Sequence, residues 1–400
     1  MFYSEPLSAK TLGFSVRKVN TLVGYSSLYE FEDFIGTVSN FDLLEVQDFK
    51  SIDRSRKVFK TLRKFDKSGR LSQLLAPSFI PERSRFYLDK KYDFLIYTFN
   101  SVFELFLFRS VQGWQDKARH KACFINELWE AELKDSDYLI ELAKDFDHIF
   151  VGLHHCVETV TRLTGKPCTY LPLGVDALKF NPFITPAKPS GIDICNIGRR
   201  SEITHKVLQE LAHRNNWFYY YDTISAKSVV DPALHITFHV KDHQEHRALY
   251  SNLLKRSRYF IANRAMVNRF KSESGKDEIP ARYFEGCAAG TIMLGEPPNN
   301  PVFRDYFGWE DAVIAAPFDA PHIGDIITEL EAQPERLATI QRNNVIHALR
   351  QHDWLHRLRT IYNAFDLPYT PAMEERAAQI NALVDQVHRS GASEAALYAT

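Results

Sequence analysis

The stretch DEIPARYFEGCAAGTIMLG, residues 277–295, indicates the fold more clearly than any other part of the chain. Pro280 fits the first turn of a helix, and Asp277 and Glu278 fit the positive end of that helix's dipole. Gly290 fits the end of the helix, immediately before an apolar strand. The stretch therefore predicts a helix that leads into a buried strand, which is half of an α/β repeat.

One face of this helix carries polar side chains suited to a ligand. Spacings of three and four residues place Arg282, Glu285 and Ala289 on the same face. A carboxylate can accept both hydroxyls of a ribose, and the amides of a helix N-terminus favour a diphosphate. An ordinary surface ion pair between the arginine and the glutamate explains the same residues with little energetic consequence. The residues alone leave both interpretations open.

The alternation of strand and helix patterns extends outward from this stretch in both directions. In the second half, strands are predicted at 192–197, 217–221, 236–238, 259–262, 291–294 and 312–315, with helices at 204–214, 244–255 and 280–289. In the first half, strands are predicted at 93–99, 121–126, 148–153 and 169–173, with helices at 137–144 and 156–164. This pattern is typical of parallel sheets covered by helices, so we expect two doubly wound units.

The proline-rich segment 181–191 interrupts the alternation and suits a surface linker. We therefore expect the following organisation: an N-terminal Rossmann-like domain (1–175), a linker (176–191), a C-terminal domain (192–350), and a return helix with a peripheral helical tail (351–400). Residues 1–90 contain a helical stretch at 54–65 but no glycine-rich turn that would announce a first Rossmann strand.

The composition excludes several classes of protein. The 49 Lys and Arg residues balance 50 Asp and Glu residues, so a bulk nucleic-acid binder is not expected. No transmembrane segment or secretory leader is evident, which favours a cytoplasmic protein and leaves a peripheral membrane contact open. The 5 cysteines form no C-x-x-C pair and are expected to be buried free thiols.

Two D-x-D sequences, at residues 135–137 and 145–147, match a known metal motif. That motif follows a strand, whereas Asp135 opens a helical pattern and Asp147 precedes a strand. Helix capping and solvated faces explain both sequences better. We therefore expect no bound metal and no cofactor.

The run Arg282-Tyr283-Phe284-Glu285 resembles a motif of retaining GT-B glycosyltransferases of the "group 1" type, whose E-x7-E helix continues into the strand. The branch related to spore-coat glycosyltransferases is the most similar. The resemblance implies that Glu285 binds the nucleotide ribose, with Arg282 and Gly290 also near the nucleotide. It also implies that the first acid of the motif falls on Asp277, with Glu278 as a neighbouring substitute.

Three further segments resemble the same family in the order that it requires. Residues 170–182 are similar to the Pro-x-Gly-Val-Asp-x-x-x-Phe-x-Pro stretch that closes the first domain. The turn after residues 192–197 implies a diphosphate site at Gly198 and Arg199, with Lys206 as the nearest match to a family lysine. A solvated basic turn is as good an explanation for Arg200. The segment 236–261 implies that Val240 and Lys241 contact the donor base.

Residues 343–358 resemble the helices that cross back to the first domain. The implied fold is α/β of the GT-B type, with two Rossmann-like doubly wound domains facing a cleft. In the first domain, His154 and Glu127 follow predicted strands, where ligands bind in parallel sheets. Trp129 suits either sugar stacking or the core.

The expected function is transfer of a sugar from a nucleotide diphospho-sugar to an unidentified glycan, lipid, protein or small-molecule acceptor. The C-terminal domain would bind the donor, while His154, Glu127, Asp277 and Glu278 are the candidate catalytic residues. The resemblance implies retention of anomeric configuration without a metal. Two alternatives stay open: a catalytically silent nucleotide-sugar-binding or regulatory module, and a GT-B-fold sugar epimerase.

Overall fold

The computed structural model describes residues 10–47, 49–65, 71, 75–184, 191–222, 239–267 and 276–398. Its contacts divide the chain into two compact units. The first contains Met1–Pro172 and Leu358–Met373, and the second contains Leu173–Arg357 and Glu374–Thr400. The domain limits expected from the sequence, at residues 175, 191 and 350, stay predictions.

The first unit is built on a parallel six-stranded sheet in the order β2-β1-β4-β6-β7-β8. Its strands are β1 (Lys10–Ser15), β2 (Asn40–Glu45), β4 (Tyr92–Ser101), β6 (Ala118–Glu127), β7 (His148–Val151) and β8 (Cys168–Tyr170). The short strands β3 (Phe86–Tyr87) and β5 (Val111–Gln112) pair separately. The four strands expected between residues 93 and 173 are therefore confirmed.

The strands β1 and β2 were not predicted from the sequence. β1 is almost wholly buried, so it shows no alternation of polar and apolar residues. Gly13 interrupts its apolar run, and the structure explains this glycine: a Cβ atom there would lie 2.2 Å from the ring of Phe41. The turn after β1 contains Arg17 and Asn20 in place of glycines, so the usual signal of a first Rossmann strand is missing.

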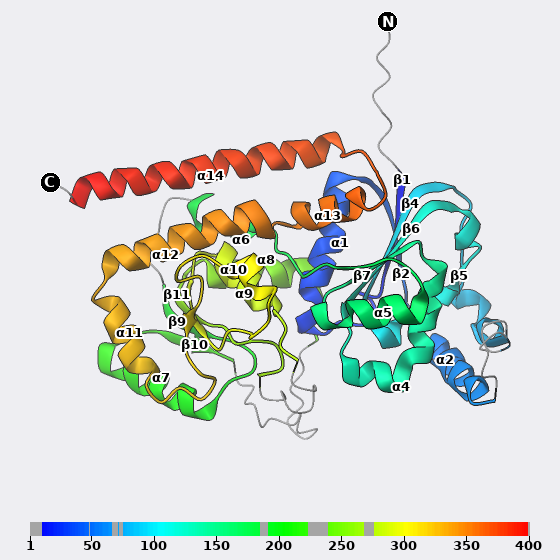
Figure 1. Cartoon of the computed structure of the whole chain (residues 1–400), viewed down its shortest axis with the longest axis horizontal. Coiled ribbons are helices and arrows are strands. Elements are labelled where there is room, and N and C mark those ends of the chain that lie inside the picture. Colours follow the sequence, from blue (N-terminus) through cyan, green and yellow to red (C-terminus); the bar gives the residue numbers. More distant parts are fainter. Residues whose placement is uncertain are drawn as a thin grey trace, which may run out of the picture. The chain divides into compact units, whose positions relative to one another are not determined.

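Helices pack against this sheet and complete the first unit (Figure 1). They are α1 (Ser26–Val38), α2 (Phe49–Arg63), α4 (Glu130–Ile140) and α5 (Val157–Thr164), with 3-10 segments that include η4 (Val102–Ser110) and η7 (His154–Cys156). The returning segment belongs to the same unit: the ring of Phe94 lies 5.9 Å from that of Tyr362 and 5.3 Å from that of Phe365. The expected return of the chain to the first domain is thus confirmed.

The second unit has a parallel five-stranded sheet in the order β10-β9-β11-β12-β13. Its strands are β9 (Ile192–Asn196), β10 (Tyr219–Tyr221), β11 (Ser257–Ile261), β12 (Ile292–Gly295) and β13 (Ile314–Ala315). The expected strand at 236–238 lies outside the described residues. Both sheets are parallel and covered by helices, which confirms the predicted α/β class.

Helices account for most of the remaining second unit. They are α6 (Ala177–Phe180), α7 (Glu202–Asn215), α8 (His243–Leu254), α9 (Ala281–Ala288), α10 (Phe303–Phe307), α11 (Ile323–Glu331), α12 (Pro334–His347), α13 (Trp354–Asn363, which passes into the first unit) and α14 (Pro371–Tyr398). The helix expected at 280–289 is α9, and Gly290 ends it with a φ of +64°. All 5 cysteines are free, and Cys168 is the only one that is not fully buried.

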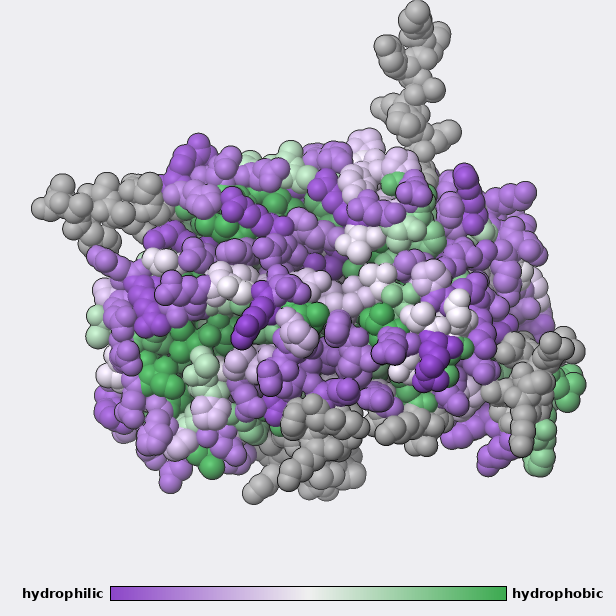
Figure 2. Space-filling model, viewed as in Figure 1, coloured by the Kyte–Doolittle hydropathy of each residue, from purple (hydrophilic) through white to green (hydrophobic). Residues whose placement is uncertain are grey.

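The surface is largely polar. Hydrophilic residues cover most of the face drawn in Figure 2, with smaller hydrophobic areas between them. Within the described part of the chain, no helix combines the length and apolar character needed to cross a bilayer.

The chain passes between the two units three times, and the second unit ties these crossings together. Val175 and Asp353 form a bridge of parallel β type, so the first and second crossing segments lie side by side. Arg376, just after the third crossing, contacts Asp353 and Asp176 at 2.6 Å each. Burial alone would lower the pKa of Arg376, but the two carboxylates more than offset this and raise it. The arginine therefore stays charged while it joins the three segments.

We expect Arg376→Ala to lower the free energy of unfolding by about 3 kcal/mol, because it leaves the fully buried carboxylate of Asp353 without its cation. The matched control is Arg389→Ala, which removes an exposed arginine from the same helix and should change stability by less than about 0.5 kcal/mol. Urea unfolding followed by circular dichroism measures both. Equal losses in the two variants would contradict the role given to Arg376.

Candidate functional site

Each sheet has one position where the strand order reverses. The first strand of each sheet lies between the second and the third strands of that sheet: β1 between β2 and β4, and β9 between β10 and β11. At each of these two strand pairs, the connections that follow the neighbouring strands cross to opposite faces of the sheet. A crevice therefore opens at the carboxyl ends of the two strands. Ligands of doubly wound sheets bind in such crevices, so the side chains at both are candidates for a site.

In the second unit, the turn after β9 brings Gly198 against Arg282 of α9. Gly198 has a φ of +92°, and a Cβ atom there would lie 1.7 Å from a guanidinium nitrogen of Arg282. Its amide donates a hydrogen bond of 2.6 Å to Asp222, which fixes the turn. Two segments that the sequence singled out separately are therefore in direct contact. A guanidinium beside a half-buried glycine backbone is an arrangement suited to phosphate oxygens.

Arg264 follows β11 at the same crevice, and sequence reasoning missed it. It forms ion pairs with Asp277 at 3.0 Å and with Glu296 at 2.7 Å. Asp277 also accepts a hydrogen bond from the amide of Asn299 at 3.0 Å. The candidate acid is thus held at the N-terminal side of α9 by a cation. A charged residue three positions beyond a buried strand was the signal that could have identified Arg264.

Glu285 lies on α9, but its partner is Arg247 of α8 and not Arg282. Both side chains of this ion pair are almost fully buried, at 3% and 5% exposure, so it is not an ordinary surface pair. The guanidinium of Arg247 also lies 4.8 Å from the ring of Phe180. Burial, together with the charge of Glu285, raises the pKa of the nearby Tyr250 well above its usual value.

The other basic candidates after β9 differ in their environment. Arg199 is half-buried, with one guanidinium nitrogen 2.8 Å from the sulfur of Met266. Arg200 is buried and contacts Asp222, so it is not the solvated basic residue that the sequence allowed. Lys206 is exposed on α7. Of the three, Arg200 has a structural role in shaping the turn.

The remaining donor-side candidates occupy three different places in the second unit. Val240 and Lys241 directly precede α8, and Lys241 is exposed. Glu278 is fully buried, and its carbonyl oxygen accepts a hydrogen bond of 3.1 Å from the amide of Ala265. Gly290 lies at the opposite end of α9 from Arg282, and a Cβ atom there would lie 3.0 Å from Val345. Its evident role is to end the helix.

In the first unit, Glu127 and His154 both lie at the carboxyl edge of the sheet. Glu127 ends β6, is exposed, and pairs in register with Ser101 of β4. His154 follows β7 and is half-buried against the ring of Tyr170 at 5.4 Å. Trp129 is 4% exposed, and among the described residues its indole N–H has no hydrogen-bond partner. The tryptophan is therefore a buried residue next to the edge.

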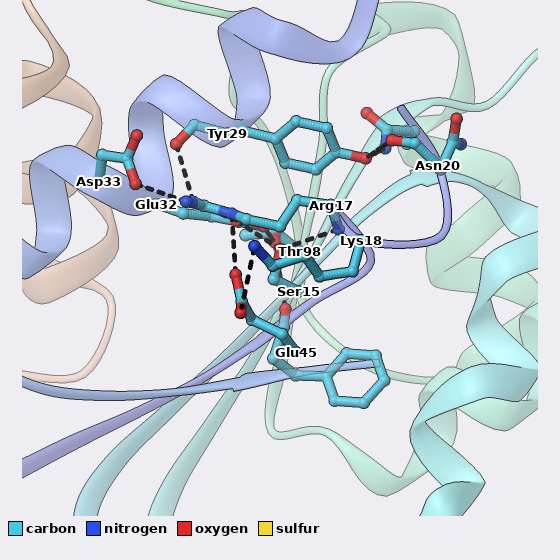
Figure 3. A network of polar contacts seen from close by, with 11 residues as sticks. Ser15, Arg17, Lys18, Asn20, Tyr29, Glu32, Asp33, Glu45 and Thr98 are labelled. Atoms are coloured by element: carbon cyan, nitrogen blue, oxygen red, sulfur yellow. Dashed lines mark hydrogen bonds and ion pairs between the residues drawn. The ribbon is translucent and has the colours of Figure 1, made fainter. Parts of the chain in front are cut away.

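A buried polar network, missed from the sequence, lies at the crevice between β1 and β4 (Figure 3). Arg17 contacts Glu32 at 2.7 Å and Asp33 at 2.6 Å, and it donates to the carbonyl oxygen of Tyr29. Glu32 also accepts hydrogen bonds from Ser15 and Thr98. Burial raises the pKa of Glu32 to about 7, although the charge of Arg17 opposes this. The network holds the loop after β1 in one conformation.

The two D-x-D sequences do not form a metal site in the described residues. Asp135 lies inside α4 and not at its start, which corrects the expectation that it opens the helix. Asp147 precedes β7 as expected and accepts a hydrogen bond of 2.9 Å from the amide of Lys121. Within the described ranges, no group of three or more His, Cys, Asp or Glu side chains is placed to hold a metal ion. Metal independence itself stays a prediction.

Gly198→Ala should lower the free energy of unfolding by about 1–3 kcal/mol, because alanine at positive φ is strained and its Cβ would displace Arg282. Gly191→Ala is the control, since a Cβ atom at that exposed glycine meets nothing within 4 Å. Adding Arg282→Ala to Gly198→Ala removes the steric part of the cost and leaves the strain. Urea unfolding of the set measures both parts, and indistinguishable midpoints for Gly198→Ala and Gly191→Ala would rule out the close approach.

Comparison with known proteins gives a family match for part of the chain. Residues 224–363 match a family model described as "Glycosyl transferase-like". This region includes α8, β11, α9, β12 and Asp277. No protein of curated function matches the sequence.

Among the solved structures that resemble this chain, two cover most of it. One is described as an "alpha-glucosyltransferase in complex with UDP-glucose and DNA containing an abasic site"; it is 11% identical, with a TM-score of 0.53, covering 90% of this chain and 100% of that one. Another, an "alpha-glucosyltransferase in complex with UDP and a 13-mer DNA containing a HMU base", is 10% identical, with a TM-score of 0.53, covering 89% and 99%. At this identity the likeness establishes the fold. The chain therefore has the GT-B fold, and its residues 224–363 match a glycosyltransferase-like family model.

Proposed function

We propose that this protein is a glycosyltransferase that moves a sugar from a nucleotide diphospho-sugar to an acceptor hydroxyl. The observation that carries the proposal is the approach of Arg282 to Gly198 at the crevice between β9 and β11. The match of residues 224–363 to a glycosyltransferase-like model supports it. The second unit would bind the donor and the first unit the acceptor.

In this proposal the donor lies along the carboxyl ends of β9 and β11. Arg199 and Arg282 bind the diphosphate together with the amide groups near Gly198, and Lys206 approaches from α7. Glu285 takes the ribose, and its pairing with Arg247 orients the carboxylate for two hydroxyls. Val240 and Lys241 lie near the base, at the start of α8.

Catalysis would rest on charge stabilisation around the departing diphosphate. Arginine side chains fixed before the reaction stabilise developing negative charge without reorganising. Arg264 is held by Asp277 and Glu296, so it is already oriented when the donor arrives. Asp277 would face the donor sugar, with Glu278 behind it. Retention of configuration and independence of metal are the finer parts of the proposal.

The acceptor side would use the carboxyl edge of the first sheet. Glu127 is an exposed carboxylate at the end of β6 and can accept a proton from an acceptor hydroxyl. His154 is a second candidate near the end of β7.

Nucleic acid is still not expected as a partner of this chain, because the formal net charge is −1.

Two alternatives keep the same donor site. A silent binding or regulatory module would bind the nucleotide sugar without turnover. A sugar epimerase would release a changed nucleotide sugar without needing an acceptor. Product analysis by chromatography separates the three functions, because transfer or hydrolysis alone releases free nucleoside diphosphate.

Thermal unfolding with nucleoside diphosphates and nucleotide sugars tests the proposal directly. A ligand at a hundred times its dissociation constant should stabilise the protein by about 2.7 kcal/mol. Release of nucleoside diphosphate in the same samples reports turnover, and we expect it to continue in EDTA. Stabilisation without release would favour the silent module, and release that stops in EDTA and returns with Mg²⁺ or Mn²⁺ would overturn metal independence. No stabilisation by any nucleotide would overturn the function.

Asp277→Asn should lower turnover by about 100-fold or more while leaving affinity for the bare nucleoside diphosphate nearly unchanged. The substitution keeps the shape of the side chain and removes the charge next to the donor sugar. Asp305→Asn, at an exposed position on α10, is the matched control. Steady-state kinetics and calorimetry measure the two effects, and wild-type turnover in Asp277→Asn would remove this carboxylate from the mechanism.

A further inference from the structure

A cavity of about 290 Å³ lies at the crevice between β1 and β4, in the first unit. Its wall contains Asn20, from the loop after β1, and Ser101 and Glu104, from the end of β4 and the start of η4. Phe103 and Arg56 line the same space. The reversal of strand order at β1 and β4 makes this the place where a doubly wound sheet binds a ligand.

Glu104 is the most unusual residue of this wall. Its side chain is only 6% exposed, yet among the described residues it forms no ion pair. One carboxyl oxygen accepts a hydrogen bond from the amide of Asn20 at 2.5 Å, and the other accepts from the backbone N–H of Asn100 at 2.6 Å. Burial raises the pKa of Glu104, and hydrogen bonds from the side chains of Asn20 and Asn100 and from the backbone of Asn100 and Ser101 oppose the shift. The acceptor positions of the carboxylate are therefore used within the chain, where they orient the amide of Asn20.

Asn20 is held in place by a hydrogen bond from Tyr29. The hydroxyl of Tyr29 donates to the carbonyl oxygen of Asn20 at 2.7 Å and accepts from the side chain of Asn100 at 2.9 Å. Arg17 fixes Tyr29 in turn, through its carbonyl oxygen (Figure 3). The side-chain oxygen of Asn20 accepts no hydrogen bond within the described part of the chain. An ordered amide with a vacant acceptor beside a buried carboxylate is suited to hydroxyl donors.

The other residues of the cavity wall, Phe103 and Arg56, limit the kinds of ligand that the cavity can bind. Phe103 is 41% exposed, so its ring can contact the C–H face of a sugar. Arg56 forms a hydrogen bond with Tyr138, which orients its guanidinium as a donor. An anion would have to approach the buried carboxylate of Glu104, and a cation would have to approach Arg56. A neutral ligand with several hydroxyls avoids both penalties.

We propose that this cavity, the Asn20–Glu104 pocket, binds a neutral sugar or polyol, and that such a group is the acceptor of the transfer reaction. The assignment as acceptor rests on the proposed function, whereas the binding of a neutral polyhydroxyl ligand does not. Hydroxyls of the ligand donate to the side-chain oxygen of Asn20, which Glu104 orients, and accept from Arg56. Phe103 covers one face of the ring.

The test uses the full chain and a fixed panel of probes. The neutral probes are the methyl glycosides of glucose, mannose and galactose, and glycerol; glucosamine and glucuronate are the charged probes. Saturation-transfer NMR detects binding, and calorimetry gives affinities. We expect at least one neutral probe to bind, and Glu104→Gln to weaken the binding of that probe about tenfold or more, since the carboxylate that orients the amide of Asn20 is lost.

Two further variants keep the test decisive. Glu158→Gln changes an exposed glutamate of the first unit and should leave the affinity unchanged. Phe103→Ala removes a partly exposed ring and should weaken binding even if Glu104→Gln fails to fold, which circular dichroism reports. The proposal is overturned if no neutral probe binds, if only a charged probe binds, or if Phe103→Ala and Glu104→Gln, when both are folded, bind like Glu158→Gln.

Nucleoside diphosphate binding, measured on the same samples, separates this proposal from the proposed function. Normal nucleotide binding without sugar binding leaves the glycosyltransferase proposal standing and removes the pocket. Sugar binding without any nucleotide binding retains the pocket as a carbohydrate site and removes the glycosyltransferase. In the wild type, the sugar that binds should also accelerate release of nucleoside diphosphate from the donor.

Discussion

The parallel direction of the strands is the constraint on which both units depend. When neighbouring strands run the same way, every connection must return over a face of the sheet, and all carboxyl ends meet at one edge. Both sheets begin in the middle and grow in both directions, so each has a reversal next to its first strand. Gly198 and Arg282 meet at one reversal and Asn20 and Glu104 at the other. Residues far apart in the sequence become neighbours for this reason alone.

Much of the fold could be predicted from the sequence because its signals are local. The strands β6 and β9 are apolar runs with polar ends, and α9 has both a start signal at Pro280 and an end signal at Gly290. The first strand could not be found in this way, because Gly13 makes sense only once the ring of Phe41 is placed beside it. The contact with Phe41 is set by strand pairing, which a single sequence does not display.

The candidate sites were predicted less completely, for a related reason. Gly198, Arg282 and Asp277 stand out as residue types in a motif, but the partner that fixes Asp277 is Arg264, which no motif includes. The sequence does contain a signal for a site at Glu104, because this residue is a lone acid within the apolar run VFELFLF of η4. A charge in such a run is expensive to bury and needs a structural or functional reason. That reason appears only with the loop around Asn20.

The three crossings of the chain between the units have a mechanical consequence. The three crossing segments are joined to one another within the second unit, through Val175, Asp353 and Arg376. A single linker between two units allows them to rotate freely, whereas three linkers that are joined to one another restrict that rotation. The connection should therefore resist twisting more than a single linker would, and Arg376 contributes to that resistance through its two ion pairs.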